Sequence, residues 1–215
     1  MRDVGRLVEG YRKFRVDTFL PQRDVFEALA HEGQRPRTMV IGCCDSRVDP
    51  TAVFGAGPGE LFVVRNVANL VPPYEPHGDF HGTSAAIDFA VNGLGVEDIV
   101  VLGHAGCGGI KAYLDGLYDP EKGGGLFIQK WMSLLKAARG TVLANHPGRA
   151  PETLQRELEM AGVVSSLGNL MSFALVADRV AAGALDIHGA YFDIASGDLR
   201  TYDRRAQRFE SLAGV

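Results

Sequence analysis

The sequence is poor in cysteine, and the cysteines that it has are badly placed for disulfide bonds. Three cysteines occur in 215 residues, which is an odd number, and Cys43 and Cys44 are adjacent. A disulfide framework needs an even number of cysteines at wider spacing. We therefore expect a reducing, cytoplasmic location, where cysteines that are not simply buried bind a metal or react.

The sequence also lacks a long apolar run and an excess of positive charge. No apolar segment approaches the roughly 18 to 20 residues that cross a bilayer, and charges recur every few residues near the amino terminus. We expect neither a membrane span nor a secretory signal. Lys and Arg number 22 against 26 Asp and Glu, which gives a net charge of −4. This balance disfavours nucleic acid as a partner, because its polyanionic backbone attracts clustered positive charge.

What is present is the composition of an ordinary globular chain, with 46% apolar and 22% charged residues. The length suits one domain, and no internal repeat or linker divides the sequence. We predict a single domain over 1–215, in which residues 1–34 form a helical amino-terminal arm. Apolar residues recur at helical spacing within the arm, with a break near Pro21.

Short apolar runs follow the arm and alternate with helical patterns. The runs at 38–42, 61–64 and 99–102 are typical of strands buried in a parallel sheet. A helical pattern at 84–95 lies between the second and third runs and indicates a βαβ crossover. Further helices are predicted at 108–117, at 126–138 and from 151 to 182 with a break around Gly168, and a hairpin at 187–194 and 199–202. The fold class is therefore α/β, a small and mainly parallel sheet flanked by helices on both faces.

The first polar motif, Cys43-Cys44-Asp45-Ser46-Arg47, directly follows the first buried run. In extended chain alternate side chains share a face, so Cys43, Asp45 and Arg47 are expected to point the same way. The carboxyl end of a parallel strand is where an α/β sheet forms its ligand crevice. A structural Asp–Arg pair beside a buried cysteine is the alternative interpretation.

The second motif, Gly103-His104-Ala105-Gly106-Cys107-Gly108-Gly109, follows the third buried run. A histidine and a cysteine three residues apart can bind one metal if the turn between them is tight, which the glycines permit. Cys107 is expected near a helix amino terminus, where the helix dipole favours the thiolate. The alternative is a glycine-rich turn that only packs.

The two motifs support each other because both follow the ends of strands in one sheet. Folding is expected to bring Cys43, His104 and Cys107 together. Two cysteines and one histidine leave one position of a tetrahedral zinc open, which is the catalytic pattern. Asp45 is the nearby residue that could fill this position or accept a hydrogen bond from water bound there.

The sequence resembles the β-class carbonic anhydrases. The resemblance rests on CCDSRVDP and GHAGCGGI, with RNVANLV at 65–71 and GTSAAIDFAVNGLGVEDIVVLGH at 82–104 between them. It is strong from about residue 38 to 112 and continues more weakly through GNL at 168–170 and IHGAYFDI at 187–194. The resemblance implies a homodimer or a dimer of dimers, with the amino-terminal helix reaching over the partner.

The resemblance further implies that Cys43, His104 and Cys107 bind one zinc ion per chain, with Asp45 as a further ligand in a closed form. The implied activity is the reversible hydration of CO2 to bicarbonate and a proton by a zinc-bound hydroxide. Relatives that hydrolyse CS2 or COS keep the same metal ligands, so this hydrolase is the alternative function. A zinc-stabilised binding module without turnover is a third hypothesis, and such a module would not need an Asp45–Arg47 pair.

In the implied mechanism Asp45 and Arg47 form the catalytic pair. Asp45 accepts a hydrogen bond from the hydroxide, and Arg47 holds the carboxylate away from the metal through charge-assisted hydrogen bonds. If the pair breaks, Asp45 can displace the water, and we expect this inactive form at lower pH. The backbone N–H of Gly108, at an expected helix start, is the candidate anchor for bicarbonate.

The sequence departs from the family pattern at two places. Cys44 replaces a small Ser or Ala and is expected to be an inert buried thiol that faces away from the metal. Some bacterial relatives hold a second, non-catalytic bicarbonate with a Trp, an Arg and a Tyr. Arg65 matches the Arg, but Val40 and Phe192 stand at the Trp and Tyr positions. We therefore predict that the chain has no such bicarbonate site.

Overall fold

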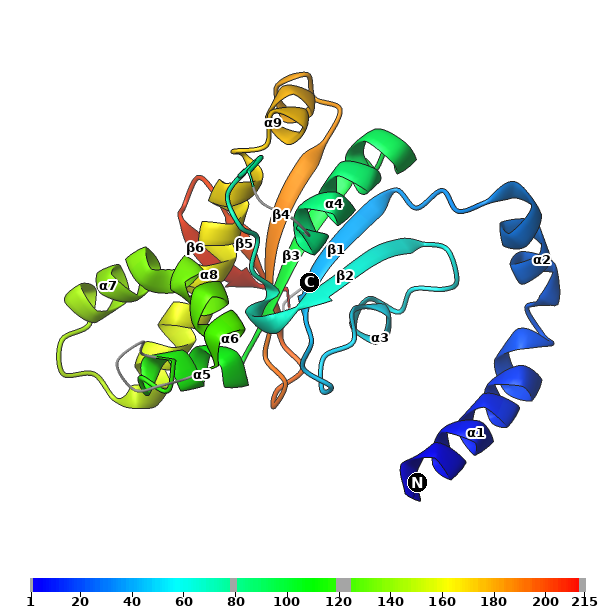
Figure 1. Cartoon of the computed structure of the whole chain (residues 1–215), viewed down its shortest axis with the longest axis horizontal. Coiled ribbons are helices and arrows are strands. Elements are labelled where there is room, and N and C mark those ends of the chain that lie inside the picture. Colours follow the sequence, from blue (N-terminus) through cyan, green and yellow to red (C-terminus); the bar gives the residue numbers. More distant parts are fainter. Residues whose placement is uncertain (1, 78–80, 119–124, 213–215) are drawn as a thin grey trace.

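The computed structural model describes residues 2–77, 81–118 and 125–212 of the chain. Its centre is a six-stranded sheet in the order β2-β1-β3-β4-β5-β6 (Figure 1). The first four strands in this order are parallel, and β5 and β6 are antiparallel additions. The strands are β1 Thr38–Cys43, β2 Leu61–Asn66, β3 Asp98–His104, β4 Asp186–Phe192, β5 Leu199–Asp203 and β6 Arg208–Ser211.

Helices fill most of the connections between the strands. They are α1 Arg2–Phe14, η1 Arg15–Phe19, α2 Arg23–Glu32, α3 Pro50–Phe54, η2 Val67–Asn69, α4 Gly82–Asp88, η3 Phe89–Leu94, α5 Gly108–Leu114, α6 Leu126–Met132, η5 Ser133–Leu135, α7 Lys136–Asn145, α8 Pro151–Leu170 and α9 Ala174–Ala181. The predicted α/β fold, with its three parallel strands, the βαβ crossover and the carboxyl-terminal hairpin, is confirmed.

Two predicted details are wrong or incomplete. The predicted break in the long helix occurs, but it lies just beyond Gly168: α8 continues to Leu170, and the chain turns at 171–173 before α9 begins. A glycine within a helix costs about 1 kcal/mol, and the buried side chains of Val163, Leu167 and Leu170 on one face of α8 outweigh that cost. The prediction also missed β6 and the short helix α3, which Asp49 caps by accepting hydrogen bonds from the N–H groups of the first turn.

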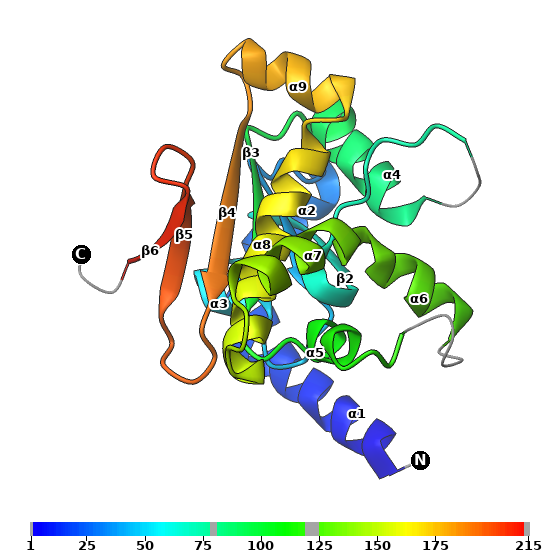
Figure 2. The same cartoon turned by 90° about the vertical axis from the view of Figure 1, so that its left-hand side faces the viewer.

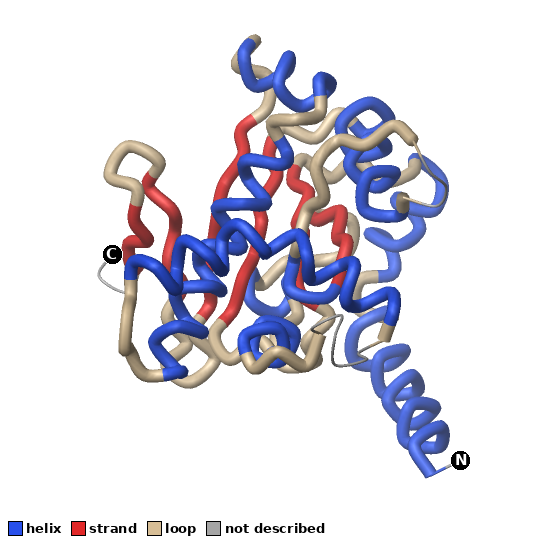
Figure 3. The backbone as a smooth tube through the Cα atoms, turned by 60° about the vertical axis from the view of Figure 1, so that its left-hand side comes forward, coloured by secondary structure: helices blue, strands red, loops and turns tan. Residues whose placement is uncertain are grey.

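The two faces of the sheet are covered unequally. Alternating strand residues such as Met39, Ile41 and Val101 lie in a large core with the side chains of α4, η3, α8 and α9. Figure 2 shows α8 lying along β3 and β4, and Figure 3 shows the helices in front of the sheet. On the opposite face Val40 and Leu102 lie in a smaller cluster, to which α3 contributes Val53.

The amino-terminal arm, residues 2–32, is helical as predicted and bends at the turn near Pro21. It projects away from the sheet (Figure 1), and neither η1 nor α2 contains a buried residue. Its apolar side chains are exposed at helical spacing on α1: Val4, Leu7, Val8, Tyr11 and Phe14. The arm therefore presents an apolar stripe that the described chain leaves uncovered.

Across the described ranges, no single helix is both long and apolar enough to cross a membrane. The helices α8 and α9 pass that test together by length and composition alone, but they are bent by 87° relative to each other.

Candidate metal centre

The two polar motifs meet at one edge of the sheet. The strands β1 and β3 are neighbouring and parallel, with Ile41 opposite Val101 and Gly42 opposite Leu102. This register brings Cys43, the last residue of β1, beside the end of β3, which is His104. Cys107 follows after a tight turn in which Gly106 has a φ of +68°, a conformation that favours glycine. The predicted convergence of the motifs is therefore confirmed.

The three side chains form a buried cluster of potential metal ligands. The sulfur atoms of Cys43 and Cys107 are 4.0 Å apart, and one donor atom from each of the three residues lies within 4.8 Å of the others. Sulfurs bound to a tetrahedral zinc at 2.3 Å are about 3.8 Å apart. His104 Nδ1 contacts the carbonyl oxygen of Ala105 at 3.0 Å, while its Nε2 is buried without a partner among the described residues. An orphaned imidazole nitrogen facing two thiols fits a zinc ion.

Backbone N–H groups surround both sulfurs. Those of Asp45 and Ala68 lower the pKa of the Cys43 thiol, and those of Gly109 and Ile110 favour the thiolate of Cys107. The hydrogen bond from the Cys107 thiol lowers the pKa of Cys43, because the two thiols share one proton. One sulfur is thus readily ionised, and metal binding displaces the remaining proton.

The Asp45–Arg47 pair expected from the sequence is formed. Arg47 donates from Nε to Asp45 Oδ1 at 2.9 Å and from Nη2 to Asp45 Oδ2 at 2.7 Å, and its backbone N–H donates to Oδ1 at 3.0 Å. These bonds hold the pKa of Asp45 well below its usual range. The pair arises from a turn rather than from the extended chain that was expected, because residues 46–47 form a turn closed by Val48 N–H to Asp45 C=O.

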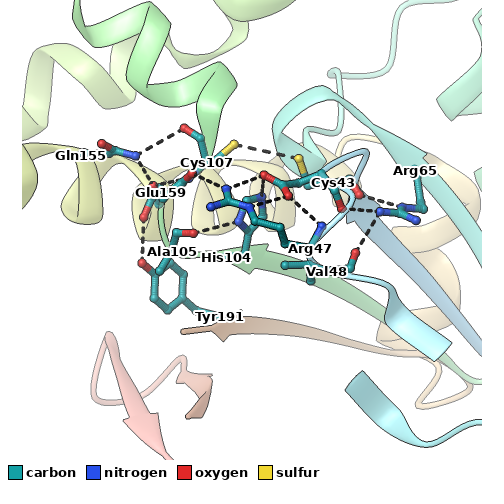
Figure 4. Close-up of polar contacts among 12 residues, drawn as sticks. Cys43, Arg47, Val48, Arg65, His104, Ala105, Cys107, Gln155, Glu159 and Tyr191 are labelled. Carbon is teal, nitrogen blue, oxygen red and sulfur yellow. Dashed lines mark hydrogen bonds and ion pairs between the residues drawn. The ribbon is translucent and has the colours of Figure 1, made fainter. Parts of the chain in front are cut away.

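The pair also lies beside the metal ligands. Asp45 Oδ2 is 3.9 Å from His104 Nε2, so the carboxylate borders the side of the cluster that the three ligands leave open. Arg47 Nη2 donates a second hydrogen bond to the carbonyl oxygen of Gly106 at 2.9 Å. Arg47 therefore links the two motifs, and Figure 4 shows it beside His104.

A second arginine holds the loop that carries Cys43 and Asp45. Arg65, on β2, donates to the carbonyl oxygens of Cys43 at 2.8 Å, of Asp45 at 2.6 Å and of Val48 at 2.9 Å (Figure 4). It also pairs with Asp49 at 3.2 Å. The guanidinium that matches the bicarbonate-binding Arg of some relatives is thus engaged by the protein itself.

The other residues of interest lie outside the metal cluster. Val40 and Phe192 lie in the same apolar cluster. Cys44 does not belong to the metal cluster, but it is exposed and not buried, so the expectation of a buried thiol is wrong. It follows the last residue of β1, where the chain leaves the sheet. A Cβ added to Gly108, the first residue of α5, would meet nothing within 4 Å, so open space lies beside this backbone.

Two features of the site were not predicted from the sequence. Ala68 and Asn69 adopt positive φ values of 63° and 48°, a conformation that is strained for residues other than glycine. The backbone N–H of Ala68 also lowers the pKa of the Cys43 thiol. The second feature is Glu159 on α8, which is 2% exposed. Its spacing from Val163 and Ser166 places it on the buried face of the predicted helix, a signal that was available in the sequence.

Comparisons with known proteins agree with this geometry. The family model described as carbonic anhydrase matches residues 38–199. A carbonic anhydrase of Synechococcus elongatus is 36% identical over 201 residues, which are 94% of this chain and 72% of that protein. The structure of the β-carbonic anhydrase CcaA is similar with a TM-score of 0.89 and 33% identity, covering 98% of this chain and 92% of that one. A structure of tetrameric β-carbonic anhydrases from Sordaria macrospora has a TM-score of 0.68 and 30% identity, covering 97% and 93%.

Proposed function

The chain belongs to the β-class carbonic anhydrases, and on this premise we propose that it hydrates CO2 reversibly to bicarbonate and a proton at a zinc ion held by Cys43, His104 and Cys107. The observation that carries the proposal is the buried cluster of two thiols and one orphaned imidazole nitrogen. It lies directly beside a carboxylate that an arginine holds in place. A purely structural zinc site has four protein ligands, whereas this cluster has three.

Zinc in such a site supplies a nucleophilic hydroxide near neutral pH, because it lowers the pKa of water to about 7. The protein provides the orientation. Asp45 Oδ2, 3.9 Å from His104 Nε2, would accept a hydrogen bond from the nucleophile and so orient it toward CO2. Arg47 keeps both carboxylate oxygens engaged, so that Asp45 does not itself take the open position.

We propose that the substrate binds beside the backbone of Gly108. The open space beside its Cα admits a small molecule, and its N–H belongs to the first turn of α5, where backbone donors favour an anion such as bicarbonate. Glycine at this position keeps that space free of a side chain.

We also propose self-association as a homodimer or a dimer of dimers. The apolar stripe of the arm, with Leu7 and Tyr11 exposed, needs a partner surface. On α6, Leu126 and Phe127 are likewise exposed. The tetrameric relative from Sordaria macrospora supports an assembly larger than one chain. A cytoplasmic location suits the site, because both of its thiols must stay reduced to bind a metal.

Metal analysis and stopped-flow hydration of CO2, on the wild-type protein and on Asp45→Ala, test the proposal. We expect one zinc per chain in both proteins and loss of most of the hydration activity in the variant, because only orientation of the nucleophile is removed. An unchanged rate in Asp45→Ala would show that the role assigned to Asp45 is wrong. Release of sulfide from CS2 or COS, without hydration of CO2, would overturn the choice of substrate. Zinc binding without either activity would overturn the proposed enzyme function and favour a zinc-stabilised binding module.

A further inference from the structure

A buried acid lies behind the metal cluster. Glu159 is 2% exposed, and its hydrogen-bond partners within the described chain are three neutral donors. Its Oε1 accepts from the backbone N–H of Cys107 and from Gln155 Nε2, both at 2.8 Å. Its Oε2 accepts from the hydroxyl of Tyr191, also at 2.8 Å. Figure 4 shows this group on the side of Cys107 that faces away from Cys43.

An acid in this position is unfavourable unless it has a specific task. Burial disfavours an ionised carboxylate and raises the pKa of Glu159 above its usual range. A buried side chain of the same size without charge would pack at lower cost. The contact that distinguishes Glu159 from a packing residue is the one to the main chain of Cys107, 52 positions away in the sequence.

The main chain of Cys107 is held from both sides. Gln155 lies one helical turn before Glu159 on α8, and its Nε2 contacts the carbonyl oxygen of Cys107 at 3.4 Å as well as Glu159. Cys107 is the residue that precedes α5, so its peptide N–H has no partner within that helix. The same carbonyl oxygen accepts a hydrogen bond from the N–H of Lys111 in α5 at 3.0 Å. With the N–H fixed to α8 and the C=O held by α5 and α8, the direction of the Cα–Cβ bond is set, and with it the position of the sulfur.

We propose that Glu159 is a positioning residue that fixes the backbone of Cys107 so that its sulfur meets the metal together with Cys43 and His104. The inference rests on the proposed zinc site. Gln155 and Tyr191 in turn fix the two oxygens of Glu159. Groups that orient metal ligands in this way commonly contribute about 10- to 100-fold to metal affinity.

Two substitutions of nearly equal size separate positioning from packing. Glu159→Gln keeps an oxygen that can accept from the N–H of Cys107, whereas Glu159→Met fills the same space without a strong acceptor. Ser166→Ala is the matched control on the same helix, because Ser166 is also buried and its Oγ accepts from the backbone N–H of Val71 at 3.1 Å. The control loses a buried acceptor that no metal ligand uses.

The measurements are the zinc dissociation constant, from competition with a chromogenic chelator, and the absorption spectrum of the cobalt-substituted protein. We expect Glu159→Met to bind zinc about 10- to 100-fold more weakly and to show an altered sulfur-to-cobalt band, with Glu159→Gln and Ser166→Ala within about threefold of wild type. If Glu159→Met does not fold, Glu159→Asp replaces it, because its acceptor is withdrawn by about 1.5 Å and weaker zinc binding is again expected.

Zinc affinity in Glu159→Met or its replacement equal to that of wild type would overturn the inference while leaving the proposed function intact. An equal loss in Ser166→Ala would also overturn it, because the effect would then be general destabilisation of α8. A wild-type protein that binds no zinc would overturn the proposed function and the inference together.

Discussion

Replacement of Arg47 by alanine tests whether the hydrogen bonds from Arg47 keep the Asp45 carboxylate away from the open side of the metal cluster. The substitution removes two hydrogen bonds from the guanidinium to the carboxylate, at 2.9 and 2.7 Å, and leaves the backbone N–H bond to Oδ1 in place. The carboxylate is then free to turn on its side-chain bonds toward His104 Nε2, from which Oδ2 is already only 3.9 Å away. We expect Asp45 to compete for the position that the nucleophile needs.

The size of the effect follows from the geometry of the pair. Hydrogen bonds between charged partners contribute about 1.5 to 3 kcal/mol when shielded from solvent, but the Arg47 side chain is 53% exposed. Because the side chain is exposed, the two hydrogen bonds together contribute about 1 to 3 kcal/mol. This free energy corresponds to about 5- to 150-fold in the equilibrium between Asp45 held by Arg47 and Asp45 turned toward the cluster. We therefore expect kcat/KM for CO2 hydration to fall by about 10- to 100-fold, with zinc content unchanged.

The assay is stopped-flow hydration of CO2 with metal analysis of the same samples, and Arg200→Ala is the matched control. Arg200 also pairs with the aspartate two positions before it, from Nε to Asp198 Oδ2 at 2.8 Å, but it lies on β5. The control should keep the wild-type rate. A wild-type rate in Arg47→Ala, or an equal loss in Arg200→Ala, would refute the idea that Arg47 restrains Asp45.

Three further predictions concern pH, bicarbonate and the substrate space. Activity should fall as the pH is lowered from about 9 to 6, around the pKa of about 7 for water on zinc; a flat profile over this range would contradict the mechanism. Because Arg47 holds the pKa of Asp45 well below its usual range, the stability that the pair contributes is present above about pH 4 and is lost only below it, so protonation of Asp45 does not cause the decline. Inhibition by bicarbonate should be non-cooperative in steady-state assays, because Arg65 is bonded to three carbonyl oxygens of the metal loop; a sigmoidal inhibition curve would show that a second site exists. Gly108→Ala places a methyl group in the open space beside the backbone and should lower kcat/KM by about tenfold, less than the roughly 100-fold that a 1 Å displacement of the substrate can cost; an unaffected rate in a variant with full zinc content would remove Gly108 from the site.

The cluster of Cys43, His104 and Cys107 could be predicted from the sequence because its arrangement depends on local features. Each ligand motif follows a short apolar run, and neighbouring parallel strands end at the same edge of the sheet. The tight turn before Cys107 was also predictable, because a glycine stands where a positive φ is needed. The same locality explains why the Asp45–Arg47 pair was found, although a turn rather than extended chain forms it.

The features that were missed depend on contacts between distant segments. Glycine lowers the intrinsic stability of a helix at Gly168, and the sequence alone does not show that packing of Leu167 and Leu170 against the sheet overrides it. Likewise, Ala68 carries no local signal for its positive φ. The residues next to Cys44 in the sequence led to the expectation that it is buried. It is exposed, and its exposure depends on the direction in which the chain leaves β1.

Two side chains from distant elements fix the backbone on either side of the cluster. Arg65 of β2 binds the carbonyl oxygen of Cys43 across 22 positions, and Glu159 of α8 binds the N–H of Cys107 across 52 positions. The guanidinium of Arg65 thus donates hydrogen bonds to backbone carbonyl oxygens, and the carboxylate of Glu159 accepts one from a backbone N–H. Each side chain therefore supplies the hydrogen-bond partner that the backbone group beside it needs. Short sequence motifs determine which residues can bind the metal. A metal ligand tolerates displacement of only a few tenths of an ångström, so contacts from distant elements are needed to hold these residues in place. A fragment that ends after α5, and so carries both motifs and β2 but lacks α8, should accordingly bind zinc far more weakly than the intact chain.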